Sequence, residues 1–443
     1  MNLNYVGSVA ERFMKFRSRL ASTEMATENI FNAVSIYVPK SLAENNLASG
    51  SYTPSAVTAD KYAVIAVTVD NYKDVLADGS VLLSQWLPVF NDGTNSAVTL
   101  YVIVFDDSDF APTLTAGAVT WSPLTKAFSE LYFISFFKTM FSEHYNGKKV
   151  TEGAVQYDDK NYFDMALALS YQCENEATLS FMLCEVNLEV PTDDSDENPC
   201  KVMTLTRGEE TAHCTTFIGT TIEERAQYFW GYLNLIGFTH TNFIVHNGSF
   251  MTPIVLGKWF EAKNDSGEFV GNKLDKIRLT GNKVKPTGLP SPLNTDVNLN
   301  LPKTIYEKLD EKNVGYFISI SDGSDNDAEL VRNRSGSNFP ITAYMIAKCI
   351  CYRASQALAN YATALGTLTK PVLANEKTYA YIQNLVLSEI QNFSGTGRIK
   401  NIVLNFPPFS EAKVGNSFEG TAVWSAVYVD DFESVDISGS ISF

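Results

Sequence analysis

Apolar and polar residues alternate at both ends of the chain, most strictly at the carboxyl end. A period of two places every second side chain on the same face of an extended strand. The residues on the apolar faces of these two segments are Leu3, Tyr5, Val9, Val435, Ile437, Ile441 and Phe443. Because chain ends usually fray, we expect segments with this pattern to be held in place. Two alternatives are open: pairing within the same domain, or β-augmentation of a sheet edge on another subunit.

The first three-quarters of the chain alternates between strand-like and helix-like patterns. Short apolar runs bounded by turn residues predict strands at Ala33–Val38, Tyr62–Val69, Val98–Phe105, Ala177–Cys184, Asn242–His246 and Gly315–Ser319. Longer patterns predict helices at Leu124–Glu143, Phe163–Cys173, Thr221–Ile236 and Lys303–Glu311. The stretch from Gly271 to Leu301 has little periodicity and predicts a long loop. Strands that alternate with helices favour a layered α/β domain.

The last quarter predicts two helices packed against a small sheet. Apolar residues at helical spacing predict a helix over Pro340–Leu365. Asn375 is placed to cap a second helix. Strands are expected at Lys400–Phe406, at Thr421–Val429 and in the terminal segment. Since Thr421–Val429 is apolar on both faces, it should be the central strand of this sheet.

Together these patterns predict a multi-domain α/β (α+β) protein with extended N- and C-terminal β-arms. An N-terminal arm and linker helix would occupy residues 1–30, and an α/β domain of one or two subdomains would occupy residues 31–330. A two-helix/β-sheet domain would follow at residues 331–432, and the C-terminal β-arm would occupy residues 433–443.

The composition is that of an ordinary globular protein, since 45% of the 443 residues are hydrophobic and 19% are charged. No apolar run reaches the roughly 20 residues that a spanning helix needs, so we expect no membrane insertion. The N-terminus lacks a basic region followed by an apolar stretch, so we expect no signal peptide and synthesis in a cytoplasm. The net charge of −16 argues against nucleic acid as a direct partner.

The charge is unevenly distributed along the chain. Residues 331–400 carry eight basic and two acidic side chains, whereas residues 401–443 carry one lysine and six acidic side chains. A basic segment in an acidic protein favours a charged partner surface, although solvated helix faces produce the same pattern.

Residues that could support catalysis or metal binding form no recognisable pattern. The sequence contains no G-x-S-x-G, no G-x-x-x-x-G-K-[ST] and no histidine pair in H-E-x-x-H spacing. Acidic clusters at residues 193–197 and 322–329 are interpreted as solvated loops, the second because it lacks the glycine placement of a calcium loop. The cysteines fit no zinc pattern and are expected to be reduced and mostly buried: Cys173, Cys184, Cys200, Cys214, Cys349 and Cys351. We therefore expect no catalytic residue, no metal site and no cofactor.

The order of elements over residues 273–443 is similar to that of a known family. The similar parts are Lys273–Thr280, Leu301–Asp310, Asn313–Ser321, the helix Pro340–Leu365 with Arg353, the helix opening Leu373–Tyr379, the break Gly395–Gly397 followed by Arg398, and the strands Ile399–Asn405, Val423–Val429 and Ile437–Phe443. This order resembles the contractile tail sheath proteins of long-tailed (myovirus-type) bacteriophages. Residues 1–264 carry no similarity that can be matched residue by residue.

The resemblance implies a structural subunit without catalytic residues. Sheath subunits polymerise as stacked hexameric rings around a tail tube, and their contraction drives the tube through the host envelope. Their terminal arms complete a sheet in neighbouring subunits, a role that would fall here to Leu3, Tyr5, Val9, Val435, Ile437, Ile441 and Phe443. The C-terminal domain lies innermost in the family, with the rest of the subunit outside it. A basic set would therefore face the tube: Arg332, Arg334, Lys370, Arg398 and Lys400.

The resemblance also implies the partners and the location. The partners would be further copies of the chain, the tail tube protein, and the baseplate and tail terminator proteins. The location would be the virion tail, assembled in the host bacterial cytoplasm. One alternative is another non-enzymatic virion component, such as a baseplate or tail-completion protein. A second alternative is an α/β enzyme whose site the sequence does not reveal. A buried cluster of charged residues in a deep pocket of residues 31–330 would favour it.

Overall fold

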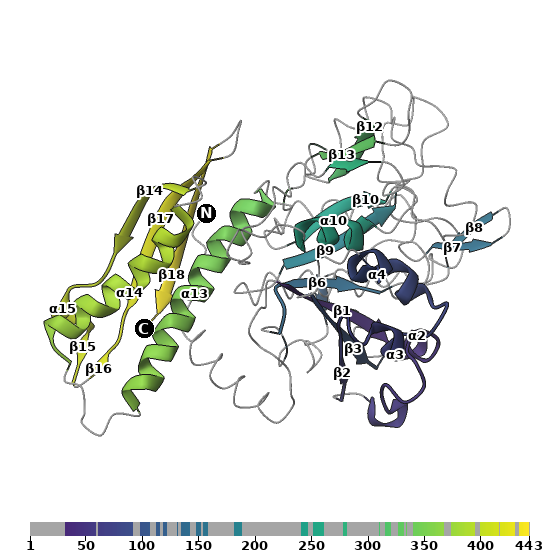
Figure 1. The fold of residues 1–443 in the computed structure, drawn as a ribbon, viewed down its shortest axis with the longest axis horizontal. Coiled ribbons are helices and arrows are strands. Elements are labelled where there is room, and N and C mark those ends of the chain that lie inside the picture. The colour runs from purple at the N-terminus through teal and green to yellow at the C-terminus, as the bar shows by residue number, and fades with distance from the viewer. Residues whose placement is uncertain are drawn as a thin grey trace. The chain divides into compact units, whose positions relative to one another are not determined.

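The protein has a mixed α/β fold in its computed structural model (Figure 1). The structure describes residues 32–58, 61–91, 98–106, 112–115, 118–121, 131, 134–141, 148–151, 154–157, 181–187, 241–246, 251–260, 278–280, 310, 315–319, 327–331, 334, 340–366, 374–394, 399–415, 417–429 and 434–442. Several predicted features lie outside these residues: Leu3, Tyr5, Val9, Arg332, Lys370, Arg398, Phe443, the helices at 163–173 and 221–236, and the acidic cluster at 193–197.

The chain divides into two compact units, which are described separately. The N-terminal unit contains Asn29–Glu176 and Ser180–Ile341, and the C-terminal unit contains Thr342–Phe443. The described strands of the N-terminal unit are β1 (Ala33–Pro39), β2 (Ala63–Val67), β3 (Thr99–Phe105), β4 (Pro112–Thr115), β5 (Ala118–Trp121), β6 (Phe137–Met140), β7 (Lys148–Thr151), β8 (Ala154–Tyr157), β9 (Phe181–Asn187), β10 (Thr241–His246), β11 (Arg278–Thr280), β12 (Tyr316–Ser319) and β13 (Asp327–Val331). Its described helices are α2 (Lys40–Asn46), α3 (Tyr72–Val75), α4 (Val81–Asn91) and α10 (Met251–Phe260), with a 3-10 turn η2 (Pro54–Ala56).

A six-stranded sheet in the order β10-β9-β6-β1-β3-β2 forms the core of the N-terminal unit. All neighbouring strands are parallel except the edge strand β2, which runs antiparallel to β3. Strands β1 and β6 are buried along their whole length. Parallel sheets are usually covered on both faces, so continuous apolar runs are expected for such strands.

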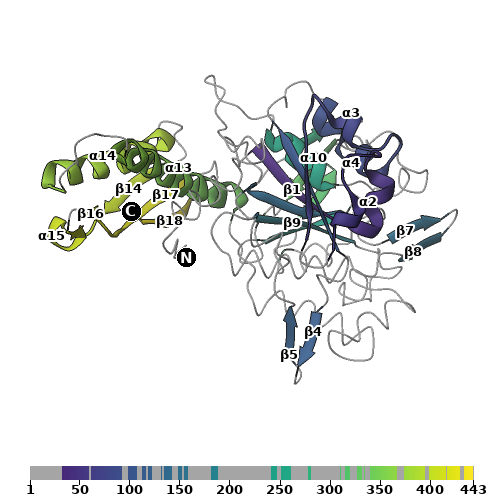
Figure 2. The ribbon, with the colours of Figure 1, turned by 90° about the horizontal axis from the view of Figure 1, so that it is seen from below.

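Helices α4 and α10 pack against each other beside this sheet. Gly257 of α10 lies next to Val89 of α4, where a Cβ atom on the glycine would be 3.7 Å from the valine Cγ2. At the start of α4, the buried Asn46 side chain accepts a hydrogen bond from the Leu82 backbone N–H at 3.0 Å and donates one to the Leu42 carbonyl at 2.8 Å. One side chain therefore joins α2 to α4. The hairpins β4–β5 and β7–β8 form separate two-stranded ribbons (Figure 2).

The helix predicted over Leu124–Glu143 is wrong at residues 137–140, where the structure has strand β6. This strand pairs with β1 on one side and β9 on the other. Because both of its faces are buried, its sequence Phe-Lys-Thr-Met lacks the alternation of a half-buried strand, and the aromatic residues around it also fit a buried helix. The aromatic residues Phe136, Phe137 and Phe181 are fully buried here, with the rings of Phe136 and Phe181 stacked at 6.2 Å.

Two loop predictions also need correction. The acidic cluster at 322–329 was expected to be a solvated loop, but its last three residues begin strand β13. Strand β11 lies inside the predicted loop 271–301 and pairs antiparallel with β13, which also pairs with β12. Arg278 and Glu329 are directly opposite each other in this ladder. Whether an acidic segment forms a strand depends on the strands it pairs with in the folded protein, and its composition contains no information about those partners.

We expect Phe137→Ala to lower the free energy of unfolding by about 3–5 kcal/mol, because its ring is fully buried and its strand β6 lies between β1 and β9. Urea unfolding of the full chain would measure this loss. Phe137→Leu keeps most of the apolar volume and serves as the control, with a smaller loss. An unchanged unfolding midpoint for the alanine variant would show that β6 is not part of the core.

Candidate functional site: the sheet of the C-terminal unit

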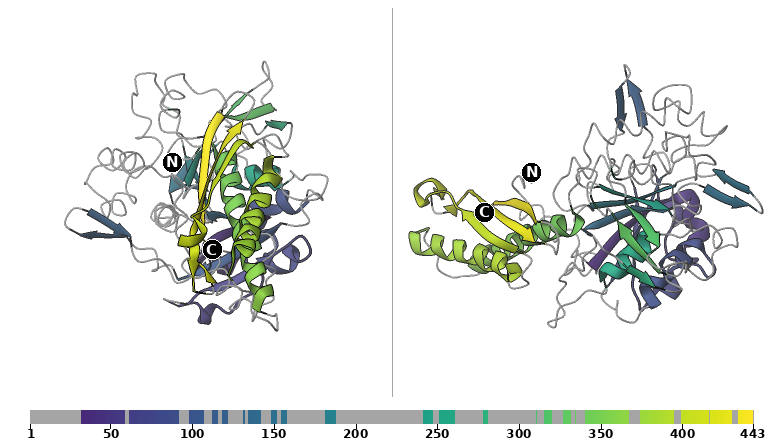
Figure 3. Two further views of the ribbon diagram at one scale, coloured as in Figure 1. Left: turned by 90° about the vertical axis from the view of Figure 1, so that its left-hand side faces the viewer. Right: turned by 90° about the horizontal axis from the view of Figure 1, so that it is seen from above.

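The C-terminal unit consists of two helices and a three-stranded antiparallel sheet. Its elements are α13 (Ile341–Gly366), α14 (Glu376–Ser394), β14 (Ile399–Asn405), α15 (Phe409–Ala412), β15 (Lys413–Val414), β16 (Ser417–Phe418), β17 (Thr421–Val429) and β18 (Ser434–Ser442). The strand order is β14-β17-β18, so β17 is central. Both long helices lie on the same face of this sheet (Figure 3).

The two helices follow the predicted apolar stripes. The buried members of these stripes are Ala343, Ala347, Ile350, Cys351, Ala354 and Leu358 in α13, and Tyr379, Ile382, Val386 and Ile390 in α14. Burial of α13 extends beyond its stripe, to Tyr344, Ile346, Cys349 and Tyr352. Asn375 caps α14 as predicted, since its Oδ1 accepts a hydrogen bond from the Thr378 backbone N–H at 3.0 Å. On the outer side, the rings of Tyr361 and Tyr381 lie 4.9 Å apart, and Tyr381 is 52% exposed.

Strand β17 is central as predicted, but only one of its faces is buried. Ala422, Trp424, Ala426 and Tyr428 are buried. The alternate residues are exposed or partly exposed, and Val423 is 50% exposed. Both faces are rich in apolar residues, but within the described chain the helices cover the sheet on one side only. The valines Val423, Val427 and Val429 lie on the less buried face.

A tryptophan and a cysteine join the central strand to the first helix. The indole N–H of Trp424 donates a hydrogen bond to Cys351 Sγ at 3.4 Å, and both side chains are buried. Burial raises the pKa of the Cys351 thiol, and the Trp424 hydrogen bond and the nearby Lys348 charge offset part of this rise. Cys349 and Cys351 are reduced and buried, as expected from the sequence.

The terminal strand β18 pairs with β17 of the same chain over nine consecutive residue pairs. Ile437 lies opposite Ala426 and Ile441 lies opposite Ala422. Both isoleucine side chains are buried, at 1% and 0% exposure. Burial of each side chain contributes about 1.5–3 kcal/mol relative to exposure. Of the two alternatives that the alternating pattern left open, the single chain therefore adopts pairing within its own domain. The role of Val435, Ile437 and Ile441 in an inter-subunit arm stays a prediction.

The two edges of the sheet differ in their backbone geometry. Between Lys400 and Val403, strand β14 contains one residue more than the facing segment of β17, which makes a β-bulge. Asn401 lies in this bulge with φ of 54°, a left-handed conformation that asparagine tolerates better than most residues. Strand β18 has no such irregularity. Bulges and lysines are devices that block strand addition at a sheet edge, so the β14 edge is the protected one.

Aromatic residues close the end of the unit where α14 begins. The Tyr379 hydroxyl donates a hydrogen bond to the Pro407 carbonyl at 2.5 Å. Its ring lies 5.2 Å from that of Phe418 and 6.0 Å from that of Phe409. The cluster connects the start of the helix to the segment between β14 and β17. Burial raises the pKa of Tyr379, so its hydroxyl remains a hydrogen-bond donor at neutral pH.

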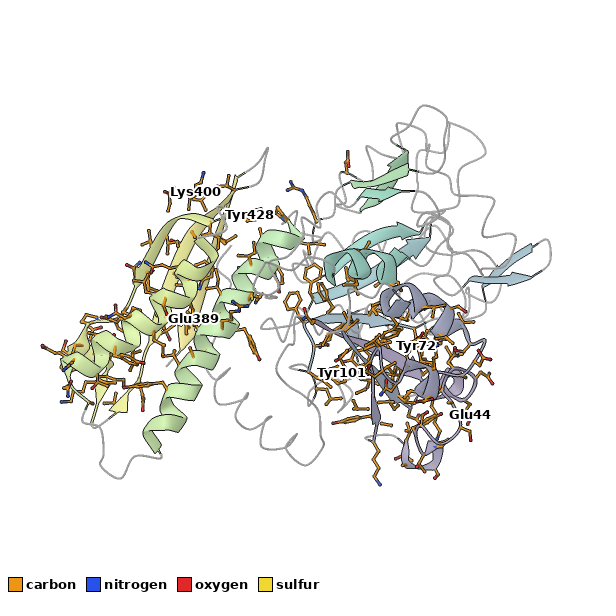
Figure 4. The ribbon with its side chains drawn as sticks, viewed as in Figure 1. Glu44, Tyr72, Tyr101, Glu389, Lys400 and Tyr428 are labelled. Atoms are coloured by element: carbon orange, nitrogen blue, oxygen red, sulfur yellow. The ribbon has the colours of Figure 1, made fainter. Side chains whose placement is uncertain are left out.

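The structure describes two of the five predicted tube-facing basic residues, and they lie in different units. Arg334 lies in the N-terminal unit, and Lys400 lies in β14 opposite Val427, close to Tyr428 (Figure 4). The Lys400 side chain is exposed. Lys348 belongs to the same basic segment but is buried, with its ammonium 5.4 Å from the centre of the Tyr344 ring. The charge count of the segment therefore includes at least one residue whose side chain is not on the surface of the single chain.

One buried polar cluster was missed from the sequence and bears on the enzyme alternative. In the N-terminal unit, Lys138 Nζ donates hydrogen bonds to the Ser135 carbonyl at 2.9 Å and to Ser135 Oγ at 3.3 Å. Ser135 Oγ lies 2.5 Å from Ser35 Oγ and donates to the Phe137 carbonyl at 3.0 Å. All three side chains have 0% exposure. A nucleophile needs substrate access, so this geometry satisfies buried polar groups within the sheet and does not form an active site.

Comparison with protein-family models and with curated proteins finds no match to this chain. Within the described ranges, no group of three or more His, Cys, Asp or Glu side chains could hold a metal ion. None of the described helices is both long enough and apolar enough to cross a membrane. The regular nine-pair ladder of β18 with β17 makes the sheet of the C-terminal unit the candidate functional site.

We expect Cys351 to resist alkylation by iodoacetamide in the folded chain, because its thiol is buried and its pKa is raised above the ordinary value of 9.0. Peptide mapping by mass spectrometry would compare folded and urea-unfolded chains, and equal modification rates would contradict the burial. A thiol with a raised pKa holds its proton more tightly in the folded state. Its contribution to stability is therefore present below pH 9.0 and is lost as the pH rises above that value.

We expect Ile441→Ala to lower the free energy of unfolding by about 2–5 kcal/mol, because the side chain is fully buried beside Ala422. Val423→Ala is the matched control in the adjacent strand, and a much smaller effect is expected because Val423 is 50% exposed. Urea unfolding at low protein concentration keeps the measurement on the single chain. Equal effects of the two substitutions would show that β18 does not pack on its own unit.

Proposed function

We propose that this chain is the structural subunit of a contractile phage tail sheath. The observation that carries the proposal is strand β18, an alternating terminal strand that completes a sheet next to two helices. The order α13, α14, β14, β17, β18 is the order of elements on which the resemblance to sheath proteins rests. A strand of this kind can supply affinity between subunits through its ladder hydrogen bonds.

The outer face of α14 and the exposed positions of β14 and β17 support a role in assembly because they carry few charges. After the first turn of α14, the residues described as exposed are Ala380, Tyr381, Asn384, Ser388 and Gln391. The exposed positions of β14 and β17 are Lys400, Asn401, Val403, Asn405, Thr421, Val423 and Ser425, and one of these seven is charged. Cores of protein interfaces are depleted of charged residues and enriched in aromatic ones. Both of these surfaces therefore have the composition expected of contacts with other copies.

The proposed assembly is built from heterologous contacts, in which one surface of a subunit meets a different surface of the next. Such contacts generate rings or helical filaments, depending on whether the rotation closes. In a sheath, hexameric rings would stack around the tail tube. Contraction would be a rigid-body rearrangement of the subunits from an extended to a more tightly packed lattice. No step of this function requires catalysis.

Contact with the tube is assigned, in this proposal, to the basic segment of the C-terminal unit. Of the basic residues predicted to face the tube, Lys400 is the one that the structure describes in this unit, and it is exposed at the bulged edge of the sheet. The baseplate and tail terminator proteins would contact the two ends of the assembly. The tube, baseplate and terminator contacts rest on the resemblance alone.

We expect the purified full-length chain to polymerise into long, hollow, helically striated tubes that negative-stain electron microscopy can detect. Self-assembly follows from β-augmentation between identical copies, which needs no other component. Uniform small oligomers would contradict the sheath proposal and favour a baseplate or tail-completion component. Monomers at all concentrations would overturn self-assembly altogether.

A further inference from the structure

Strand β18 occupies in its own chain the position that the proposed function assigns to it in a neighbouring chain. The ladder with β17 is complete, with nine pairs from Val429–Ser434 to Thr421–Ser442. We propose that this pairing caps the free subunit, and that assembly proceeds by exchange, in which β18 leaves its own β17 and pairs with β17 of a second copy. The inference rests on the proposed function, and it adds the step that controls when a subunit becomes competent to polymerise.

The contacts of β18 explain why exchange is favoured over simple addition of a strand to the sheet. Ile437 and Ile441 are buried opposite Ala426 and Ala422, in the part of the sheet that the helices cover. A strand that replaced β18 would recover both the backbone ladder and this burial. A strand added beyond β18 would recover the ladder alone. Exchange therefore preserves the free energy of the original contacts, and its equilibrium depends mainly on protein concentration.

The other edge of the sheet does not offer an alternative route. Asn401 interrupts the β14 ladder with its left-handed backbone, and the adjacent Lys400 is exposed. An incoming strand at this edge would meet unevenly spaced backbone groups and a charge. The regular nine-residue ladder of β17 with β18 is therefore the pairing that a second copy can reproduce.

The connection between the exchanging strands is short. Four residues separate β17 from β18 in the sequence, and three of them are acidic: Asp430, Asp431 and Glu433. Exchange of an identical element between copies is a low-cost route to assembly. After exchange, a subunit would donate its β18 to a second copy and accept β18 from a copy through the same residue pairs that it makes on its own.

A reversible cross-link tests the exchange directly. Ser425 of β17 and Ser438 of β18 are directly opposite each other, so S425C/S438C places a disulfide between the two strands. The control variant N405C/V423C places the same bond between β14 and β17, which stay together in the proposal. We expect the oxidised S425C/S438C chain to lose polymerisation and to recover it when reduced. The control should polymerise in both states.

Cross-linking after assembly gives a second readout. Oxidation of assembled S425C/S438C should link different copies and produce a ladder of covalent multimers on non-reducing gels. Oxidation of the control, or of dilute unassembled chains, should produce links within one chain, as peptide mapping would confirm. Tubes formed by the oxidised S425C/S438C chain, or links confined to single chains after assembly, would overturn the exchange while leaving the sheath proposal intact. Failure of the unaltered chain to form tubes would overturn the proposed function and the exchange with it.

Discussion

The hydrogen-bonded position of β17 between two antiparallel neighbours is the constraint on which the C-terminal unit depends. One face of this strand carries Trp424, whose indole reaches Cys351 on the helix above. Its backbone pairs with β14 on one side and with β18 on the other. Strand β17 therefore determines three features of the unit: the contact of the sheet with α13, the register of β18 and the difference between the two sheet edges. A change in any one of these would alter the others, since all act through a single backbone.

The two units bury their sheets in different ways. Strands β1 and β6 of the N-terminal unit are buried throughout, as is usual for a parallel sheet covered on both faces. Polar groups that enter that sheet, such as Lys138, are satisfied within it. The C-terminal sheet is covered on one face and leaves Val403 and Val423 half exposed. A sheet with an uncovered, weakly charged face is suited to contacts with further molecules.

Patterns within a few neighbouring residues were sufficient to predict helices with a periodic apolar stripe and a helix start with a capping residue. The stripe of α13 and the cap at Asn375 were both predicted from the sequence, because they depend on neighbours within a few residues. Strand β6 was not predicted, because burial on both faces removes the alternation that distinguishes a strand. The burial of Lys348 and the bulge at Asn401 depend on distant partners, and charge counts or strand propensities contain no information about them. The candidate site was therefore predicted as a terminal strand, while its partner strand and its protected edge required the structure.

The bulge in β14 has a consequence for the shape of anything that the chain builds. Under the exchange that we propose, and with the β14 edge closed, each copy would give one β18 strand and receive one. With respect to this strand, such a monomer is bifunctional. Bifunctional monomers yield linear chains or closed cycles, whereas a third reactive edge would yield branched networks that gel. In the proposed assembly, the left-handed Asn401 would thus limit the connections made through this sheet.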